Sequence, residues 1–268
     1  MNKIGFIGCG KMASAIIKGL LAKNFILATN IIASQAENEG LEEKSKQLGI
    51  KIVNDNCEVV NFSDVVIIAT KPSQVVEVLK EISPSLSSDK LIVSIAAGVT
   101  LSKLESNLPQ NSRVIRVMPN TPALVGEAMS GMIGGEFASQ NDIDFIHALL
   151  STIGKCIIVN EESQMDIVTA ISGSGPAFFY KVMNDIARAG EKLGLDYEKS
   201  LLLSIQTAIG SAKMALNREI SMEELVSNVA TKGGCTRVGI DTMESLNIDS
   251  ILFDTIKNTT IKAKELGE

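Results

Sequence analysis

A short glycine-rich segment near the start of the chain has the spacing of a dinucleotide-binding turn. Gly8-Cys9-Gly10-Lys11-Met12-Ala13 has the pattern GxGxxA and directly follows an apolar run that begins at Ile4. Between a strand and a helix, Gly8 permits the tight turn, Gly10 lets the backbone approach a pyrophosphate, and Ala13 allows close helix packing. The N-terminus of that helix favours the negative charge of phosphates. The pattern therefore predicts a nucleotide cofactor at this turn.

The residues after the second predicted strand bear on which nicotinamide cofactor binds. NAD enzymes place an Asp or Glu at this position for the ribose hydroxyls. This chain has Ser34-Gln35-Ala36, and Glu37 is predicted to begin a helix. The missing acid favours NADP(H), because an acid would repel the 2′-phosphate, but the absence of an arginine leaves NAD(H) open. Ser34, Gln35 and the nearby Lys11 can supply the hydrogen-bond donors.

Two loops in the second half of the chain also contain clustered glycines. One is Ser172-Gly173-Ser174-Gly175-Pro176, and the other is Ala230-Thr231-Lys232-Gly233-Gly234-Cys235-Thr236. Each precedes a predicted helix. In the second loop, Gly-Gly followed by a small residue, Thr and a helix exposes backbone N–H groups with the helix dipole behind them, which favours binding of a carboxylate. The alternative for each loop is a glycine corner between two helices.

Several other chemistries lack the residues that they need. The single histidine, His147, lies in a predicted helix away from the glycine clusters, so histidine-based metal sites are excluded and we expect a structural role for it. The four cysteines form no CxxC pair, which excludes a zinc ribbon and a thioredoxin-type motif. Four scattered cysteines in a chain of this length are typical of a reducing cytoplasm. No GxSxG is present, and neither Tyr180 nor Tyr197 is followed by Lys four residues later.

Composition excludes further classes of protein. The chain has 268 residues with 25 basic and 31 acidic side chains, a net charge of -6. With roughly 150 residues per domain, this length predicts about two domains. The acidic balance, eight Phe, two Tyr and no Trp argue against a nucleic-acid groove. No apolar run reaches the roughly 18 residues of a membrane span, and the early strand-like segment gives no sign of a signal peptide. We therefore expect a cytoplasmic, metal-free protein with neither nucleic acid nor membrane as partner.

The elements that position the first glycine turn follow an alternating pattern. Continuous β-branched runs predict strands at 4–7, 30–33, 65–69, 91–95 and 114–117, with helical patterns between them, as at 72–82. Such runs are typical of strands buried on both faces of a parallel sheet. Residues 127–159 add two strands around a helix from about 139 to 153. The alternation predicts an α/β, Rossmann-type doubly wound sheet over residues 1–161.

From residue 162 the chain shows only helical patterns. They cover 176–193, 197–216, 223–229, 237–246 and 251–266. Many are apolar around most of their circumference, which is typical of buried helices. About a hundred residues cannot bury such helices alone. We therefore expect residues 162–268 to form an all-α domain that packs against a second copy in a twofold dimer.

Six motifs in order carry a resemblance to a known family. They are GFIGCGKMA at 5–13, ATKP at 69–72, SIAAGV at 94–99, RVMPNTPA at 116–123, SGSGPAFF at 172–179 and VATKGGCTRVGIDTME at 229–244. Over nearly its whole length the chain resembles pyrroline-5-carboxylate reductases. The resemblance implies an oxidoreductase that uses NADPH or NADH to reduce the C=N bond of 1-pyrroline-5-carboxylate to L-proline, the last step of proline biosynthesis. It also implies a Rossmann domain, a helical dimerisation domain, and assembly into homodimers or decamers.

The resemblance also implies a set of cofactor-binding residues. At the pyrophosphate it places Ile7, Gly8, Cys9, Gly10, Lys11 and Met12, and at the adenosine ribose or its 2′ substituent Ser34, Gln35 and Asn56. Along the carboxyl ends of further strands it places Ala69, Thr70, Lys71, Pro72, Ile95, Ala96 and Ala97, and near the nicotinamide Asn120.

The substrate residues implied by the resemblance lie in the second half. The carboxylate-binding residues are Gly233, Gly234, Cys235 and Thr236, the pocket wall is shaped by Gly175 and Pro176, and Glu219 matches a position near the substrate. Thr236 also reaches the ring nitrogen, so it is the candidate catalytic residue. A protonated imine accepts a hydride readily, so positioning can supply most of the catalysis. Thr236 would orient the nitrogen or relay a proton through water.

Departures from the family pattern leave two alternatives. Lys232 stands where Pro is common, and we expect it to face solvent. Lys181 and Asn184 replace more usual apolar residues, and Lys-x-x-Asn resembles the catalytic helix of β-hydroxyacid dehydrogenases, in which the Lys is a general acid. That alternative explains neither MPNTPA nor the GGxT loop, so we expect Lys181 on an exposed helix face. A non-enzymatic NADP-binding regulator is the other alternative, and the intact Thr236 loop disfavours it.

Overall fold

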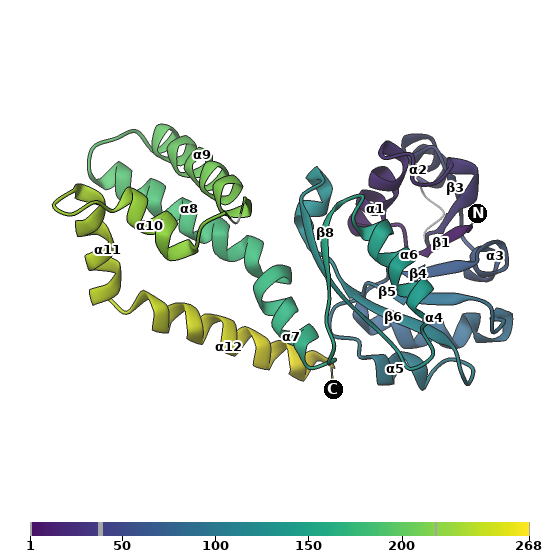
Figure 1. Cartoon of the computed structure of the whole chain (residues 1–268). Helices are drawn as coiled ribbons and strands as arrows, with labels where there is room; N and C mark the ends of the chain where they lie inside the picture. Colours follow the sequence, from purple (N-terminus) through teal and green to yellow (C-terminus); the bar gives the residue numbers. More distant parts are fainter. Residues whose placement is uncertain (1, 37–39, 218, 268) are drawn as a thin grey trace. The chain divides into compact units, whose positions relative to one another are not determined.

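The computed structural model describes residues 2–36, 40–217 and 219–267. Glu37, the predicted start of a helix, lies outside the described residues. The chain divides into two compact units (Figure 1). Unit 1 comprises Met1–Ser174 and Thr259–Glu268, and unit 2 comprises Gly175–Asn258.

Unit 1 contains one eight-stranded sheet in the order β3-β2-β1-β4-β5-β6-β7-β8. Its strands are β1 (Ile4–Ile7), β2 (Ile31–Ser34), β3 (Lys51–Val53), β4 (Val65–Ile68), β5 (Leu91–Ser94), β6 (Arg113–Met118), β7 (Ala128–Gly134) and β8 (Gly154–Ile158). All neighbouring pairs are parallel except β6 and β7, which are antiparallel. The connection between β6 and β7, the 3₁₀ helix η4 (Thr121–Val125) and its flanks, is too short for the crossover that a parallel pair needs.

Helices cover both faces of the sheet, as the continuous apolar strands predict (Figure 1). Within β1, Ile4 and Phe6 belong to one apolar layer and Ile7 to the other. The first layer includes side chains of α1 (Lys11–Ala22), α2 (Leu41–Leu48) and α6 (Gln140–Leu150). The second includes those of α3 (Asn56–Phe62), α4 (Val75–Ile82) and α5 (Leu101–Glu105). The predicted doubly wound α/β architecture is confirmed.

One strand of unit 1 is absent from the sequence prediction. β3 has only three residues, and none of them is buried. Such a strand lies at the sheet edge and has no continuous apolar run to reveal it. The predicted helix at 72–82 is also divided, because the 3₁₀ helix η2 (Pro72–Gln74) precedes α4.

Unit 2 is helical, as predicted. It contains α8 (Gly175–Lys192), α9 (Tyr197–Leu216), α10 (Met222–Val229), α11 (Cys235–Ser245) and the first part of α12 (Ile248–Gly267). α8 and α9 pack closely, since a Cβ on Gly190 would lie 2.5 Å from Ser200 Oγ. Many large apolar side chains of this unit are exposed in the single chain; Phe179 and Leu202 are each 67% exposed.

The predicted loop at Ser172–Pro176 is wrong. α7 (Gln164–Val168) continues into a π-helix, η5 (Thr169–Gly173), and only Ser174 separates that helix from α8. Gly173 serves close packing instead of a turn, because a Cβ there would lie 2.5 Å from Met118 Cε. The pattern of small residues indicated a loop, but these residues instead let the helix lie against β6.

The end of α12 belongs to unit 1. A Cβ on Gly267 would lie 2.8 Å from the carbonyl oxygen of Gly98, and a Cβ on Gly98 would lie 3.4 Å from Leu266. The last turn of the chain therefore packs on the loop after β5. The division at residue 162 reflects a change of sequence pattern and stays a prediction.

Candidate functional site

The predicted cofactor residues of unit 1, apart from Asn56 on α3 and Asn120 after β6, lie at or just after the carboxyl ends of four adjacent parallel strands. Ile7 is in register with Ser34 of β2 and Ile68 of β4, and Ile68 is in register with Ser94 of β5. Backbone hydrogen bonds continue past the strand ends: Ala69 N donates to Ile7 O (2.8 Å) and Ile95 N donates to Ile68 O (3.1 Å). Ligands of open α/β sheets bind at this edge.

Glycine occurs at the two positions of the first turn for different structural reasons. Gly8 has φ = +95°, and a Cβ there would lie 2.8 Å from the carbonyl oxygen of Ala69. Gly10 has an extended conformation and is the N-cap of α1, and a Cβ there would meet nothing within 4 Å. Gly8 is therefore required by the fold, whereas Gly10 keeps open space in front of the helix.

The N-terminus of α1 is suited to an anion. No side chain caps it, and its first turn holds no acidic residue, so its N–H groups are available to a phosphate. Cys9 is buried, and burial raises the pKa of its thiol, which keeps the side chain uncharged beside that position. Ala13 is also buried, as expected for close helix packing.

A buried hydroxyl without a partner lies beside the same turn. Thr70 Oγ1 is buried and has no hydrogen-bond partner among the described residues. The methyl carbon of Thr70 would lie 3.1 Å from a Cβ on Gly8. Buried polar atoms are rarely left unpaired, so this hydroxyl is suited to a ligand at the turn. Together with the open space at Gly10, it makes unit 1 fit a bound dinucleotide.

The predicted ribose residues form a hydrogen-bonded cluster. Ser34 Oγ donates to Asn56 Oδ1 (2.6 Å), and Asn56 Nδ2 donates to Glu81 Oε2 (2.9 Å). Gln35 Oε1 accepts from Lys44 Nζ (2.8 Å). Glu81 and Lys44 come from α4 and α2 and were missed, because only the folded chain brings these helices to the end of β2.

Asn120 is held by the protein at both ends of its amide. Oδ1 accepts from Met129 N (2.9 Å), and Nδ2 lies within hydrogen-bonding distance of Ser172 O (3.1 Å) and Ser172 Oγ (3.3 Å). Ser172 Oγ in turn donates to Met129 O (2.6 Å). Asn120 is only 7% exposed. These contacts fix the loop after β6, and its predicted place near the nicotinamide stays a prediction.

In unit 2 the predicted carboxylate-binding loop leads into α11. Gly233 has φ = +80°, and Gly234, whose N–H donates to Thr231 O (3.0 Å), is the N-cap of α11 without a side-chain cap. Cys235 and Thr236 are the first two residues of that helix, so their N–H groups have no acceptor within it. A carboxylate can accept from these groups.

The guanidinium of Arg237, next to this loop, already pairs with two carboxylates. Arg237 donates to Asp241 (Nε to Oδ1, 2.7 Å) and to Glu244 (Nη2 to Oε2, 3.2 Å). The pKa of Arg237 is raised, mainly by its hydrogen bond to the Asp241 carboxylate. Lys232 is exposed, as expected. If the loop binds a carboxylate, as predicted, its backbone N–H groups are suited to donate to it.

The remaining predicted substrate residues are spread over unit 2. Gly175 and Pro176 are the first residues of α8, and Glu219 is exposed in the segment between α9 and α10. Their roles stay predictions. The predicted cofactor residues belong to unit 1 and the Thr236 loop to unit 2.

The residues of the β-hydroxyacid dehydrogenase alternative have structural partners. Lys181 Nζ pairs with Asp185 Oδ2 at 2.5 Å, and the Lys181 side chain is 72% exposed. Asn184 Oδ1 accepts from the Tyr197 hydroxyl (2.9 Å), which joins α8 to α9. His147 lies on α6 with Nε2 3.2 Å from Cys156 O, a structural contact. Asn184 therefore joins two helices, and Lys181 lies on an exposed helix face, as expected.

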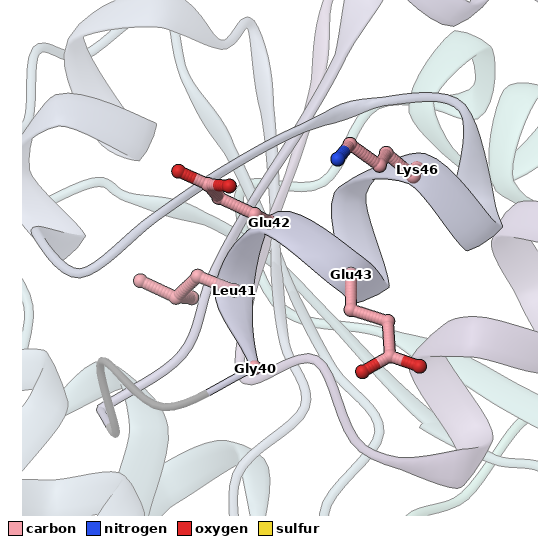
Figure 2. Close-up of a pocket in the computed structure, with 5 residues that line it drawn as sticks. All are labelled: Gly40, Leu41, Glu42, Glu43 and Lys46. Atoms are coloured by element: carbon pink, nitrogen blue, oxygen red, sulfur yellow. The ribbon is translucent and has the colours of Figure 1, made fainter.

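A separate, shallow pocket lies at the start of α2 (Figure 2). Its lining residues are Gly40, Leu41, Glu42, Glu43 and Lys46. None of these is a predicted cofactor or substrate residue, and the two glutamates disfavour a phosphate. Over the described ranges, no group of His, Cys, Asp and Glu is arranged to hold a metal ion. Nor does any helix there combine the length and apolarity of a membrane span.

The doubly wound sheet and the glycine turn are typical of a dinucleotide-binding protein, and its relatives are NAD(P)-dependent oxidoreductases. Residues 3–98 match the family model described as NADP oxidoreductase, coenzyme F420-dependent. Residues 162–266 match the model for pyrroline-5-carboxylate reductase dimerisation. The chain is 39% identical to the pyrroline-5-carboxylate reductase of Methanosarcina acetivorans over 100% of this chain and 98% of the relative. It is 38% identical to that of Pseudomonas aeruginosa, over 99% and 97%. This chain belongs to the pyrroline-5-carboxylate reductase family.

Solved structures agree with this assignment. The pyrroline-5-carboxylate reductase of Coxiella burnetii has a TM-score of 0.95 at 33% identity, covering 100% of this chain and 99% of the other. The Plasmodium falciparum pyrroline carboxylate reductase, solved with NADP bound, has a TM-score of 0.87 at 30% identity, covering 100% and 98%. The resemblance inferred from the six motifs is confirmed.

Proposed function

We propose that this protein reduces the C=N bond of 1-pyrroline-5-carboxylate to L-proline, with NADPH preferred over NADH. The observation that carries the proposal is the start of α11, where Gly234 leaves the N–H groups of Cys235 and Thr236 without a side-chain cap. An uncapped helix N-terminus with an adjacent hydroxyl is suited to a small carboxylate whose neighbouring nitrogen needs a hydrogen-bonding group. Membership of the reductase family supports the same substrate.

Each group of residues has a distinct part in this reaction. The nicotinamide supplies the hydride when it is bound. The turn at Gly8–Gly10 and the first N–H groups of α1 bind the pyrophosphate, and the Asn120 contacts fix the loop after β6. The α11 N-terminus binds the substrate carboxylate, and the Thr236 hydroxyl orients the ring nitrogen. Since a protonated imine already accepts a hydride, these residues act mainly by positioning.

The preference for NADPH rests on the end of β2. Ser34 and Gln35 follow the strand where an NAD enzyme would have an acid. The NADP-bound structure of the Plasmodium falciparum relative supports the same cofactor. We therefore place the NADP(H) ribose at Ser34, Gln35 and Asn56.

The assembly follows from the exposed apolar helices. Leu203 of α9 and Phe253 of α12 are 59% and 66% exposed in the single chain, and residues 162–266 match a dimerisation model. A homodimer through these helices would bury such side chains. Light scattering of the purified protein would distinguish a dimer from the decamer that the family resemblance suggests.

The division into domains at 161/162 and a cytoplasmic role in proline biosynthesis are part of the same proposal.

A steady-state assay tests the reaction. Purified protein is given NADPH or NADH with the five-membered 1-pyrroline-5-carboxylate or a six-membered cyclic imino acid. We expect the highest kcat/KM with NADPH and the five-membered ring, and Lys181→Ala should keep that activity. Oxidation of a β-hydroxy acid that is abolished by Lys181→Ala would support the dehydrogenase alternative. NADPH binding without turnover of either imine would support the regulator.

A further inference from the structure

A lysine that no sequence motif includes lies at the end of β2. Lys44 belongs to α2 and is partly buried. Its Nζ donates to Gln35 Oε1 at 2.8 Å, and the backbone of Gln35 is fixed in turn by a bond from its N–H to Val53 O (2.9 Å). The ammonium is therefore held at the strand end where the sequence has neither an acid nor an arginine.

The same ammonium acts on the glycine turn. The positive charge of Lys44 lowers the pKa of Cys9, against the larger effect of burial, which raises it. Such an effect requires that the two groups lie close together. Gly8 N also donates to Ser34 O at 3.2 Å, so the turn and the end of β2 are neighbours. Lys44 thus lies beside Gln35 at the end of β2, and that strand end adjoins the glycine turn.

A carboxylate near this position would oppose the binding of a phosphate, and a cation there would offset it. Glu81 is joined to Ser34 through Asn56, and its carboxylate would repel a 2′-phosphate of about two negative charges. Lys51 on β3 pairs with Glu58 at 2.5 Å, so its charge is already balanced. Lys44 differs, because among the described residues its hydrogen-bond partner is the neutral amide of Gln35.

We propose that Lys44, oriented by Gln35, binds the 2′-phosphate of NADP(H) and sets the preference of this chain for NADP(H) over NAD(H). The inference rests on the proposed function for the class of cofactor alone, and not for the imine substrate. Lys44, nine residues beyond Gln35, would supply the positive charge that an arginine after β2 would otherwise provide.

Direct binding tests the assignment without turnover. NADPH and NADH are titrated into the purified full-length protein without imine, followed by nicotinamide fluorescence, and adenosine 2′,5′-bisphosphate is used as competitor. A charge-assisted hydrogen bond lost from Lys44→Ala should weaken NADPH and the competitor on the order of tenfold or more and leave NADH nearly unchanged. Lys44→Arg should keep most of the preference, because it keeps the charge.

Lys46 provides the matched control. It lies on the same helix two residues further, hence on a different face, and lines the shallow pocket with Glu42 and Glu43 (Figure 2). Lys46→Ala removes the same charge and should leave the NADPH to NADH ratio unchanged. Melting temperatures of all variants show whether each is folded.

Three results would overturn the proposal: equal weakening of both cofactors by Lys44→Ala, an equal effect of Lys46→Ala, or a wild-type protein that binds NADPH no more tightly than NADH. Its failure is separable from that of the proposed reaction. A protein that reduces neither imine but loses NADPH selectivity in Lys44→Ala refutes the reaction alone. One that makes proline with an unaltered cofactor ratio in that variant refutes the role of Lys44 alone.

Discussion

Asn120 and Ser172, 52 residues apart, close a ring of hydrogen bonds around the backbone of Met129. The ring joins the loop after β6, the strand β7 and the π-helix η5. A π-helix turn is rare and often occurs at functional sites. Here it brings the Ser172 hydroxyl to the carbonyl of Met129, and so it fixes the loop that carries Asn120.

Removing the Asn120 amide should therefore destabilise the protein. Asn120→Ala leaves Met129 N–H and Ser172 C=O without their partners, at a cost of about 2–4 kcal/mol in the free energy of unfolding. Asn120→Asp should be at least as harmful, because a carboxylate oxygen would face the carbonyl of Ser172. Urea unfolding measures both, with exposed Asn141→Ala as control. An Asn120→Ala protein that keeps full stability and loses only cofactor binding would contradict this account.

Alanine at the two turn glycines should separate folding from binding. Gly8→Ala combines φ = +95° with a 2.8 Å approach to a backbone oxygen, so we expect a loss of stability of about 2 kcal/mol or more. Gly10→Ala meets no protein atom within 4 Å and should fold normally, but its methyl group should weaken NADPH binding more than about tenfold. Thermal melts and fluorescence titration test the pair. Tight NADPH binding by Gly10→Ala would place the pyrophosphate elsewhere.

Thr236 should affect the imine without affecting the cofactor. Thr236→Ala removes one hydroxyl at the start of α11 and should lower kcat/KM for 1-pyrroline-5-carboxylate by roughly 10- to 100-fold. Thr236→Ser keeps the hydroxyl and should recover most of this loss. The dissociation constant for NADPH should stay the same in both variants. An Ala variant with unchanged kcat/KM would remove Thr236 from the mechanism.

Alkaline pH should weaken the fold through Cys156. Burial raises the pKa of this thiol from its ordinary value of 9.0 to about 12. The unfolded chain therefore loses its proton first, so this contribution to stability is complete below pH 9 and decreases as pH rises from about 9 to 12. Cys9, whose pKa burial also raises, acts in the same direction.

Urea midpoints at pH 8 and pH 10.5 measure this effect. The midpoint should fall at the higher pH, and Cys156→Ala should reduce the fall, whereas Cys57→Ala controls for the loss of one thiol. An equal fall in Cys156→Ala and wild type would assign the alkaline loss to other groups.

Sequence patterns predicted the elements whose signals are local. The β-branched runs gave β1, β2, β4, β5 and β6 within one or two residues, and the helical periodicity gave α9 at its observed bounds. The glycine spacing at 8–13 also depends on one short segment. β3 was not predicted, because three residues without a buried side chain carry no periodic pattern.

Relationships between distant segments could not be predicted in this way. Nothing in the sequence near Asn120 points to Ser172, and Lys44 reaches Gln35 only because α2 lies beside the end of β2. The prediction of a loop at 172–176 was wrong for a related reason. Small residues indicate a turn when considered alone, but the packing of Gly173 on Met118 requires a small residue within a helix.

The path of α12 has a consequence for recombination between relatives. Because the last turn of this helix packs on Gly98, just after the predicted cofactor residues that follow β5, unit 1 is discontinuous in the gene. A chimera made with a single crossover near Ser174 would set one parent's C-terminal segment against the other parent's loop. Exchange of the cofactor unit requires two crossovers, so that Thr259–Glu268 travels with the first 174 residues. A chimera that takes unit 1 from one parent should therefore take the last turns of α12 from the same parent.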